Sequence, residues 1–176
     1  NSEPTTSQYE LFKKYDRFSP EEYTALAAHC RARGVTFLST PFDDAAVDFL
    51  DPLMPLFKIA SADLTCVPLL EKVAAKNKPV LLSTGAASPG EVDEALAILE
   101  DGGAAGVHLM HCVLNYPTQD HNASLGQIAA LARLFPGRLI GYSDHTLPEP
   151  NMDALTFAYI LGARVLEKHF THDKRL

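Results

Sequence analysis

The sequence predicts a parallel α/β fold of the barrel type, and three regularities support this prediction. Apolar runs begin at residues 35, 57, 80, 107, 139 and 165, which is a spacing of one strand and one helix per repeat. The runs are apolar throughout, as strands buried on both faces are. Polar residues follow every run, and parallel strands bring such residues together at their carboxyl ends. The polar residues follow all six runs, whereas in a doubly wound sheet they would gather at one crevice. A barrel is therefore favoured over a doubly wound sheet.

The chain is expected to open with residues 1–18 as a polar loop that contains one helical turn. Helices then begin at two sites of the same kind, where a serine is followed by a proline and, three residues after the serine, by a glutamate. These sites start at Ser19 and Ser88. Glycines stand where helices are expected to end, at Gly34, Gly102 and Gly162.

Six strands are expected to alternate with the helices, at residues 35–39, 57–60, 80–83, 107–110, 139–142 and 165–168. A complete eight-stranded barrel needs two further strand–helix units. Residues 1–176 are therefore expected to be a partial barrel whose missing part precedes residue 1. The open edges of such a sheet need another segment to close them, or the fold is an open variant.

The composition is that of one globular domain. The chain has 176 residues, 47% of them hydrophobic, and a net charge of −7, which argues against nucleic acid as a partner. No apolar run approaches the roughly 20 residues of a membrane span, and no signal peptide is recognisable. Three cysteines without a Cys-x-x-Cys pair are expected to be buried reduced thiols in a cytoplasmic protein. They are Cys30, Cys66 and Cys112.

Two histidines near the end of the chain form a candidate metal site. His145 and His169 each follow an apolar run. Because side chains alternate along a strand, Ser143 shares a face with His145. Glu167 shares a face with His169 in the same way. Neutral imidazole is a common ligand of divalent metal ions. Asp144 and Glu167 could be further ligands, orient the ligands or carry protons, and either histidine taken alone could instead be structural.

Lys58 marks a candidate anion site. It lies inside an apolar run, where an unpaired ammonium group would be costly, so it is expected to meet a fixed negative charge. Gly85 lets backbone N–H groups approach a ligand. Hydroxyl groups that can donate hydrogen bonds to an anion follow neighbouring strands, at Ser61, Ser83, Thr84 and Ser143. In the alternative, Lys58 pairs with a structural carboxylate and the hydroxyls cap helices.

The segment 111–118, HCVLNYPT, extends from the run at 107–110 into a loop. His111 and Cys112 point to opposite faces of a strand, so His111 is poorly placed to activate the thiol, and Cys112 is interpreted as packing. Asn115 and Tyr116 lie in the loop and could hydrogen-bond a polyol, although Tyr-Pro is equally a common loop stiffener.

Six ordered motifs together resemble the sialic acid synthase family, whose members condense phosphoenolpyruvate with an N-acylated amino sugar. The motifs are Phe37-Leu-Ser-Thr-Pro-Phe42, Phe57-Lys-Ile-Ala-Ser61, Leu82-Ser-Thr-Gly85, Leu109-Met-His-Cys112 with Tyr116-Pro117, Gly141-Tyr-Ser-Asp-His-Thr146 and Leu166-Glu-Lys-His-Phe-Thr171. The resemblance runs from about Ser7 to the end of the chain. It implies a TIM (β/α)8 barrel in which this chain corresponds to strands three through eight.

The resemblance implies roles for several residues. His145 and His169 correspond to the ligands of a divalent metal ion, Mn²⁺ or Mg²⁺. Tyr116 corresponds to a sugar contact, with Asn115 beside it in the same loop. The phosphoenolpyruvate-binding set corresponds to Lys58, Ser61, Ser83 and Ser143, with Thr40 nearby. Lys58 and Glu167 are predicted to be the catalytic residues.

The implied activity is metal-assisted condensation of phosphoenolpyruvate with N-acetylmannosamine or a related N-acyl amino sugar, which releases phosphate and forms a nonulosonic acid. The acceptor stays open, because a common form of the family places an asparagine where Leu114 stands here. Alternative products are legionaminic acid, pseudaminic acid, a 9-phosphate or a related 3-deoxy-sugar acid. Outside enzymes, the alternative is a catalytically incomplete anion-binding module.

Some parts that the family would supply are absent from this sequence. They are a glutamate on the first strand, a lysine and a glutamine on the second, and a C-terminal antifreeze-like domain that reaches over the partner's site. The chain alone is therefore expected to be inactive and self-associating, and the full-length protein to be a homodimer. Its other partners are expected to be small substrates, and neither nucleic acid nor a membrane.

Overall fold

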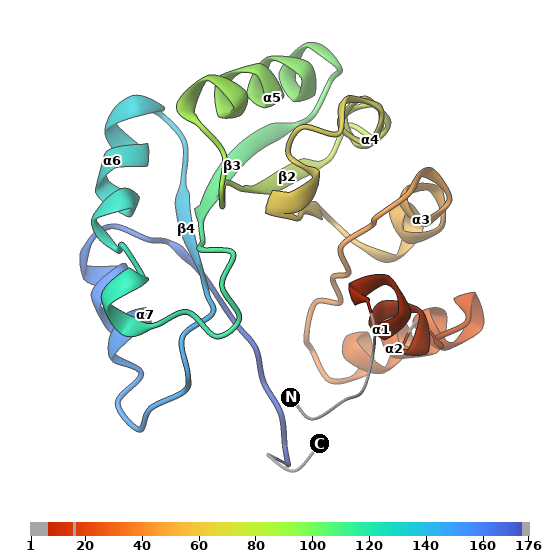
Figure 1. Ribbon diagram of the computed structural model, residues 1–176. Helices are drawn as coiled ribbons and strands as arrows, with labels where there is room; N and C mark the ends of the chain where they lie inside the picture. Colours follow the sequence, from red (N-terminus) through yellow and green to blue (C-terminus); the bar gives the residue numbers. More distant parts are fainter. Residues whose placement is uncertain (1–6, 16, 174–176) are drawn as a thin grey trace. The chain divides into compact units, whose positions relative to one another are not determined.

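The computed structural model describes residues 7–15 and 17–173 of the chain (Figure 1). The chain divides into two compact units, Asn1–Phe37 and Leu38–Leu176. The first unit is helical, and the second contains a parallel β-sheet with its helices. All the strand ends that carry predicted site residues lie in the second unit.

The first unit contains helices α1 (Gln8–Tyr15) and α2 (Pro20–Ala32). Ser19 caps α2 as predicted, because its hydroxyl accepts a hydrogen bond from the Glu22 backbone N–H, and the Glu22 carboxylate accepts one from the Ser19 backbone N–H. The eight residues of α1 are longer than the single turn expected there. Glu10 in the first turn and two lysines in the last turn complement the helix dipole, which favours helix over loop.

The prediction of a strand at residues 35–39 is wrong, since these residues have no regular secondary structure. Val35 and Leu38 are 60% and 42% exposed. An apolar run becomes a strand only where a neighbouring strand pairs with its backbone N–H and C=O groups. Among the described residues the first paired strand begins at Phe57.

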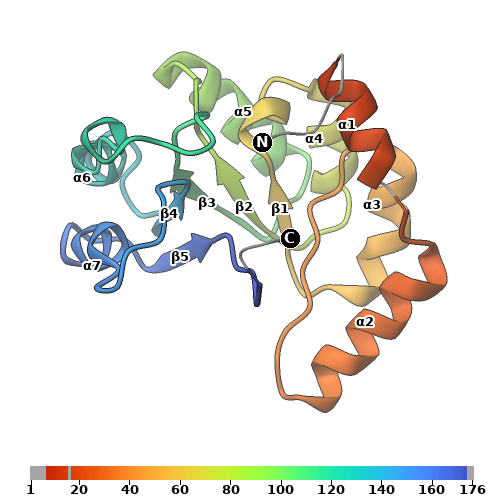
Figure 2. The same cartoon turned by 60° about the horizontal axis from the view of Figure 1, so that its bottom comes forward.

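The second unit holds five parallel strands in the order β1-β2-β3-β4-β5. They are β1 (Phe57–Ile59), β2 (Pro79–Ser83), β3 (Gly106–His111), β4 (Ile140–Asp144) and β5 (Val165–Lys168). Each strand pairs with the next one along the chain, as in a barrel wall, whereas the strand order of a doubly wound sheet reverses at a switch point. Figure 2 shows the five strands as one curled wall. The predicted parallel α/β fold is confirmed as a curled half-barrel.

Helices cover the outer face of this wall (Figure 1). They are α3 (Asp44–Leu50), α4 (Val67–Ala74), α5 (Pro89–Asp101), α6 (Gly126–Leu134) and α7 (Asp153–Ile160), with short 3-10 turns at Asp51–Leu53, Ser61–Asp63 and Asp120–Asn122. α5 begins after Ser88 with a capping box and is followed by Gly102, as predicted. Within the described part of the chain, no helix combines the length and the apolar character needed to span a membrane.

The register of the strands decides which side chains face the helices. Lys58 is the partner of Leu81, and Ser143 is the partner of Glu167, so these side chains share the concave face. The alternating residues face the helices and form the core. They include Phe57, Ile59, Val80, Leu82, Leu109 and Tyr142, none more than 1% exposed. The apolar core therefore lies outside the wall, which leaves the concave face for polar chemistry.

The three cysteines are free thiols and differ in burial. Cys112 is buried and Cys30 is half-buried, whereas Cys66 is exposed. The expectation of buried thiols is therefore wrong for Cys66. The reason is its position, since it is the N-cap residue of α4, in the outer layer of helices.

Candidate functional site

The candidate site lies on the concave face, toward the carboxyl ends of the strands, and a chain of polar contacts crosses it. Lys58 on β1 and Glu167 on β5 form an ion pair, with Nζ and Oε1 3.4 Å apart. Ser143 on β4 donates a hydrogen bond of 2.7 Å to the same carboxylate oxygen. Since β1 and β5 are the two edge strands of the sheet, this ion pair connects opposite sides of the curl.

The ion pair between Lys58 and Glu167 is only partly removed from water, because the two side chains are 17% and 40% exposed. A pair exposed to this degree contributes about 0–1 kcal/mol. The structure thus contains the carboxylate partner that one interpretation of Lys58 requires. An incoming anion would displace only a weak contact, so the same lysine stays available to a ligand.

His145 and His169 lie side by side beyond β4 and β5, with ring centroids 5.6 Å apart. The ring of Tyr116 packs against both of them, at 4.0 Å from His145 and 5.7 Å from His169. Tyr116 is 64% exposed. The structure therefore brings together the two predicted metal ligands and the predicted sugar contact, and it places the tyrosine at the solvent side of the group.

His145 is held in one tautomer. Its Nδ1 lies 2.6 Å from the Val113 carbonyl oxygen, and since a carbonyl can only accept, Nδ1 carries the proton and Nε2 keeps its lone pair. The hydroxyl of Ser143 lies 3.4 Å from this Nε2. Burial lowers the pKa of His145 and outweighs the hydrogen bond to Val113. A neutral imidazole with a free Nε2 is the form that ligates metal ions, so His145 fits the predicted role.

Two histidines do not complete a metal coordination shell. No group of three or more His, Cys, Asp or Glu side chains that could surround an ion occurs within residues 7–15 and 17–173. His145 and His169 would therefore leave several coordination positions to water or substrate oxygens. Open positions of this kind distinguish a site that can activate a substrate from a purely structural one.

The end of β2 carries an unpaired donor. Ser83 is 2% exposed, and its hydroxyl is one of two buried side-chain atoms that have no hydrogen-bond partner among the described residues. The other atom is a carboxylate oxygen of Asp63. A buried polar group left unpaired costs roughly 1–3 kcal/mol. Ser83 shares the concave face with Leu81 and hence with Lys58, so a ligand oxygen held there would find both groups.

Gly85 allows the ends of neighbouring strands to approach each other. A Cβ atom at this position would lie 2.7 Å from Cys112 Sγ and 3.1 Å from Ser61 Oγ. The thiol and the hydroxyl therefore flank Gly85 on either side, at the ends of β3 and β1. A residue with a side chain would collide with the Cys112 thiol, so this position requires glycine. Cys112 fills space beside it, in line with its interpretation as packing.

Three other predicted residues take no part in this chain of polar contacts. Thr40 is half-buried and makes no hydrogen bond or ion pair among the residues that the structure describes. The hydroxyl of Thr84 donates to the Met110 carbonyl oxygen at 3.2 Å, so its donor is already used. Asn115 is exposed, and its backbone oxygen accepts from the Thr118 hydroxyl at 2.8 Å.

Asp144 points away from the site. One carboxylate oxygen accepts hydrogen bonds from the Tyr142 hydroxyl at 3.0 Å and the Thr146 backbone N–H at 2.9 Å. The other lies 2.6 Å from Lys168 Nζ. Burial by itself would raise the pKa of Asp144, but the contacts from Lys168 and Thr146 outweigh it and hold the pKa below its ordinary value. The carboxylate is therefore ionised and fully engaged behind the histidines, which makes it unsuited to be a metal ligand.

Lys168 is a contact that the sequence analysis missed. It immediately precedes His169, as Asp144 immediately precedes His145. Since neighbouring side chains point to opposite faces of a strand, Asp144 and Lys168 are both expected on the face opposite to the histidines. Their opposite charges at these equivalent positions were the signal that could have revealed the ion pair.

His111 faces the helices, because in the strand register it is the partner of Tyr142 on the core face of the sheet. Its Nε2 donates to the Ala123 carbonyl oxygen at 2.8 Å, and its ring stacks on Tyr142 with the centroids 5.6 Å apart. Burial lowers the pKa of His111 and outweighs this hydrogen bond. His111 is therefore a neutral core residue and lies behind the candidate site.

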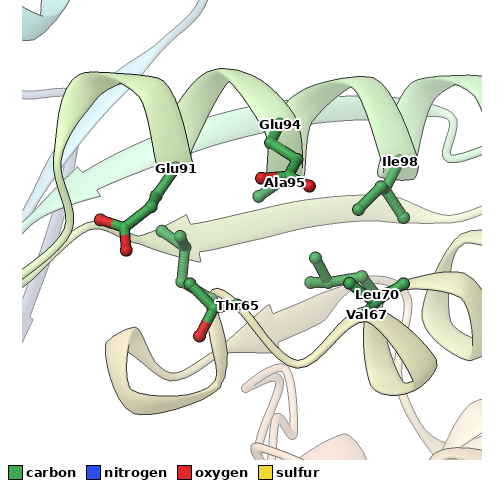
Figure 3. A pocket seen from close by; sticks show the side chains of 8 residues that line it. Thr65, Val67, Leu70, Glu91, Glu94, Ala95 and Ile98 are labelled. Atoms are coloured by element: carbon green, nitrogen blue, oxygen red, sulfur yellow. The ribbon is translucent and has the colours of Figure 1, made fainter.

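A small groove on the outside of the molecule is separate from this site. Figure 3 shows it between α4 and α5. It is lined by Leu64, Thr65, Val67, Leu70, Glu91, Glu94, Ala95 and Ile98. None of these residues belongs to the predicted site. The Glu91 carboxylate is already engaged by Ser88 in the cap of α5, and the negative charges of Glu91 and Glu94 make the groove unsuited to an anionic substrate.

Comparison with known proteins assigns the chain to a family. The sequence matches the NeuB family over residues 1–176. An uncharacterized protein of Methanocaldococcus jannaschii is 46% identical over 169 residues, which are 96% of this chain and 49% of that protein. The N-acetylneuraminate-9-phosphate synthase of Drosophila melanogaster is 39% identical over 167 residues, which are 94% of this chain and 44% of that protein. The chain spans about half the length of the curated relatives it matches.

Other matched relatives are named N,N'-diacetyllegionaminic acid synthase and pseudaminic acid synthase. Among solved structures, the N-acetylneuraminic acid (sialic acid) synthetase of Leptospira borgpetersenii superposes with a TM-score of 0.88 at 31% identity, covering 97% of this chain and 59% of that one. The sequence match and the structural match thus agree, and this chain belongs to the NeuB family.

Proposed function

We propose that this chain forms part of the catalytic barrel of a nonulosonic acid synthase, which condenses phosphoenolpyruvate with N-acetylmannosamine or a related N-acyl amino sugar. Matched relatives named as synthases of N-acetylneuraminate 9-phosphate, N,N'-diacetyllegionaminic acid and pseudaminic acid support this class of reaction. The observation that carries the proposal is the buried, unpaired hydroxyl of Ser83 on the same face as Lys58. A hydroxyl without a partner among the described residues, on the same face as an ammonium group whose ion pair is weak and partly exposed, is suited to an enol phosphate.

Lys58 and the serine hydroxyls bind the phosphate and the carboxylate of phosphoenolpyruvate in this proposal. Ser83 is free to donate, and Ser61 lies beside Gly85 at the neighbouring strand end. The Ser143 hydroxyl donates its hydrogen bond to Glu167. When the ligand binds, this hydroxyl either rotates to donate to the ligand or continues to hold the Glu167 carboxylate. Holding both anionic ends of the substrate fixes the direction of its reactive C3, which makes positioning the main contribution of these residues.

The reaction joins C3 of phosphoenolpyruvate to the aldehyde carbon of the open-chain sugar, and positive charge develops at C2. The aldehyde oxygen takes up a proton and becomes the new hydroxyl. Water adds at C2 and gives up its protons, and cleavage of the bond between C2 and the phosphate oxygen releases inorganic phosphate and leaves a ketone at C2. Glu167, held by Ser143 and Lys58, is placed to stabilise that positive charge and to accept the proton of the attacking water. Lys58 stabilises the negative charge of the departing phosphate.

His145 and His169 bind a divalent ion, Mn²⁺ or Mg²⁺, in the same proposal. A bound ion supplies Lewis-acid polarisation of the aldehyde oxygen of the acceptor. The residues of the chain fit this role, because the Val113 carbonyl orients His145 with its Nε2 free, and the two rings lie 5.6 Å apart.

Tyr116 and Asn115 contact the acceptor sugar in this proposal. Both are exposed, and Tyr116 packs on the two histidine rings. An exposed aromatic ring beside the aldehyde site can cover the apolar face of a sugar. Acceptors that differ in their N-acyl groups or carry a phosphate would be distinguished in this loop.

Release of inorganic phosphate tests the function. Because the 176-residue chain alone is expected to be inactive, the purified full-length protein is incubated with phosphoenolpyruvate, Mn²⁺ and one acceptor at a time: N-acetylmannosamine, its 6-phosphate, or a diacetamido sugar of the legionaminic or pseudaminic series. Phosphate is expected only when an acceptor is present, together with a nonulosonic acid detected by mass spectrometry. Phosphate release that is independent of any acceptor would contradict the proposal.

The Ser83→Ala variant sharpens this test. Removing a buried unpaired hydroxyl should leave the protein at least as stable as before, yet weaken phosphoenolpyruvate binding by about tenfold, the value of one hydrogen bond to a charged group at the lower end of its range. Thr84→Val is the matched control, because its hydroxyl is paired with Met110 inside the protein. It should lower stability and leave ligand binding unchanged.

A second function is supported by the ion pair between Lys58 and Glu167. If the pair is purely structural, the chain is an anion-binding module without turnover. Calorimetry that detects phosphoenolpyruvate binding in a protein that releases no phosphate with any acceptor would favour this function over the synthase.

A further inference from the structure

A buried ion pair connects the two strand ends that carry the histidines. Asp144 on β4 and Lys168 on β5 are direct partners in the strand register. Their side chains are 1% and 13% exposed, and the charged atoms lie 2.6 Å apart. The pair lies on the outer face of the sheet, opposite to the face of Ser143 and Glu167. It is therefore outside the ligand-binding side of the candidate site.

Thr146 closes the pair into a ring of hydrogen bonds. Lys168 Nζ donates to the Thr146 carbonyl oxygen at 2.9 Å. The Thr146 backbone N–H donates to Asp144 at 2.9 Å. Asp144 also accepts from the Tyr142 hydroxyl. Asp144 and Thr146 are the residues on either side of His145, and Lys168 precedes His169. These hydrogen bonds therefore connect the backbone around His145 to the residue next to His169.

We propose that Asp144 and Lys168 are positioning residues that set the relative placement of His145 and His169. Each charged residue immediately precedes one histidine. The distance between the two outward charges therefore fixes the distance between the backbone segments from which the two imidazoles extend inward. The placement of the rings is a property of the protein alone, and only its consequence for metal binding rests on the proposed function.

A general contribution to stability is the competing explanation, and the chain offers a matched control for it. Arg138, in the segment before β4, and Glu100 on α5 form another ion pair, with atoms 2.5 Å apart and Arg138 21% exposed. Arg138 precedes β4 and also donates to the Val107 carbonyl oxygen at the start of β3. This pair thus lies near the amino ends of the strands, at the opposite end from the histidines.

The first test observes the imidazole rings in the absence of metal. Ring-nitrogen NMR signals of His145 and His169 are compared between the wild-type protein, Lys168→Met and Arg138→Met. Lys168→Met should shift the signals of both histidines. The Tyr116 ring packs against both imidazoles, so a displacement of either imidazole changes the ring-current effect of Tyr116 on its signals. Arg138→Met should leave them in place. Unchanged signals in Lys168→Met, or equal shifts in both variants, would overturn the proposal.

Lys168→Met leaves a buried carboxylate unpaired, which can prevent folding. The double variant Asp144→Asn with Lys168→Met removes both charges and should fold, with the imidazole signals again displaced. Lys168→Arg keeps the ion pair and should restore the wild-type signals. A double variant that folds with wild-type imidazole signals would overturn the proposal even if the single variant is insoluble.

The second test measures Mn²⁺ affinity by electron paramagnetic resonance. Residues behind metal ligands typically change affinity by roughly 10- to 100-fold when replaced, so the double variant should bind Mn²⁺ at least about tenfold more weakly than Arg138→Met. Equal affinities would count against a positioning role. A wild-type protein that binds no Mn²⁺ would contradict the proposed function, and the imidazole signals would still decide whether the ion pair positions the rings.

Discussion

At the scale of single residues, the candidate site combines groups that are already paired with groups that are not. Glu167 accepts a hydrogen bond from Ser143 and forms an ion pair with Lys58, so three residues from three strands hold one another in place. The hydroxyl of Ser83 has no such partner within the described chain. In the proposed function, a ligand anion would gain most from Ser83 and Lys58, with the preorganised Glu167 carboxylate beside them.

Lys58→Met should weaken phosphoenolpyruvate binding by about 10- to 100-fold, since a hydrogen bond to a charged group is worth about 1.5–3 kcal/mol. Isothermal titration calorimetry measures the change. Lys72→Met is the control, because this lysine pairs with Asp48 at 2.7 Å among the outer helices and should leave the affinity unchanged. Equal affinities in the wild-type and Lys58→Met proteins would identify Lys58 as a structural residue.

His169→Ala should reduce Mn²⁺ affinity at least about tenfold, because one of the two proposed protein ligands is lost. The exposed His121 provides the comparison, and His121→Ala should bind Mn²⁺ like the wild-type protein. Titration followed by electron paramagnetic resonance distinguishes the two. If both variants bind the ion equally well, His169 is not a ligand.

Gly85→Ala should weaken phosphoenolpyruvate binding, because the new methyl group would lie 2.7 Å from Cys112 Sγ and 3.1 Å from Ser61 Oγ. The crowding displaces the serine that is proposed to bind the ligand. Adding Cys112→Ala removes the closer of the two neighbours and should restore much of the affinity. A double variant that binds no better than Gly85→Ala would show that the defect does not come from this contact.

At the scale of secondary-structure elements, identical caps serve helices with different amounts of buried surface. α2 and α5 both begin with a reciprocal pair of hydrogen bonds between a serine and a glutamate. α2 buries only Ala27 completely. α5 buries Val92, Ala95, Leu96 and Leu99. The cap of α5 therefore supports a helix that contributes several side chains to the core, whereas the cap of α2 supports a helix that buries little.

Ser88→Ala should lower the free energy of global unfolding by about 1 kcal/mol, the usual value of a lost N-cap. Ser19→Ala should mainly increase hydrogen exchange in the first turn of α2, with a smaller effect on global unfolding. Chemical denaturation and amide hydrogen exchange measure the two effects. Equal losses of global stability would show that α2 unfolds together with the rest of the protein.

At the scale of the whole molecule, the polar groups are sorted by the two faces of the curled sheet. Lys58, Ser143 and Glu167 occupy the concave face, whereas the buried His111 and Asp144 lie on the outer face, under the helices. Groups on the concave face can change partners when a ligand binds. Groups on the outer face contribute to the stability of the folded chain, and their ionisation therefore couples stability to pH.

His111 should make the protein less stable as the pH falls. Burial lowers its pKa in the folded state, so the unfolded chain takes up a proton at higher pH than the folded chain does. The stabilisation is complete above the unfolded value of about 6.5. It is lost toward the lower folded pKa, at no more than about 1.4 kcal/mol per pH unit for one group.

The measurement is the unfolding free energy of the wild-type protein and His111→Asn between pH 7.5 and pH 5 (roughly the range around the unfolded pKa). The variant is less stable at neutral pH, but its stability should fall less steeply with acidification. His121→Asn, in which an exposed imidazole is replaced, should keep the wild-type slope. Parallel curves for the wild-type protein and His111→Asn would contradict the prediction.

The sequence by itself determined much of the second unit and the start of α2 in the first. The parallel strands follow from the spacing of the apolar runs. The capped starts of α2 and α5 follow from capping chemistry, and the gathering of Lys58, Ser143, His145 and His169 on one face follows from side-chain alternation. The same local rules failed at residues 35–39, because no short segment reveals whether another strand will pair with it. They failed again at Gln8–Tyr15, where helix-favouring charges lay within a polar segment.

Only the tertiary structure decided which polar groups meet. Lys58 reaches Glu167 from the opposite edge of the sheet, so this pair depends on how strongly the sheet curls. Asp144 meets Lys168, 24 residues further along the chain, because the register of β4 and β5 places them opposite each other. The curvature of the sheet and the register of its strands arise from the packing of all helices and strands together. Neither can be predicted from the residues of a single strand and its neighbours in the sequence.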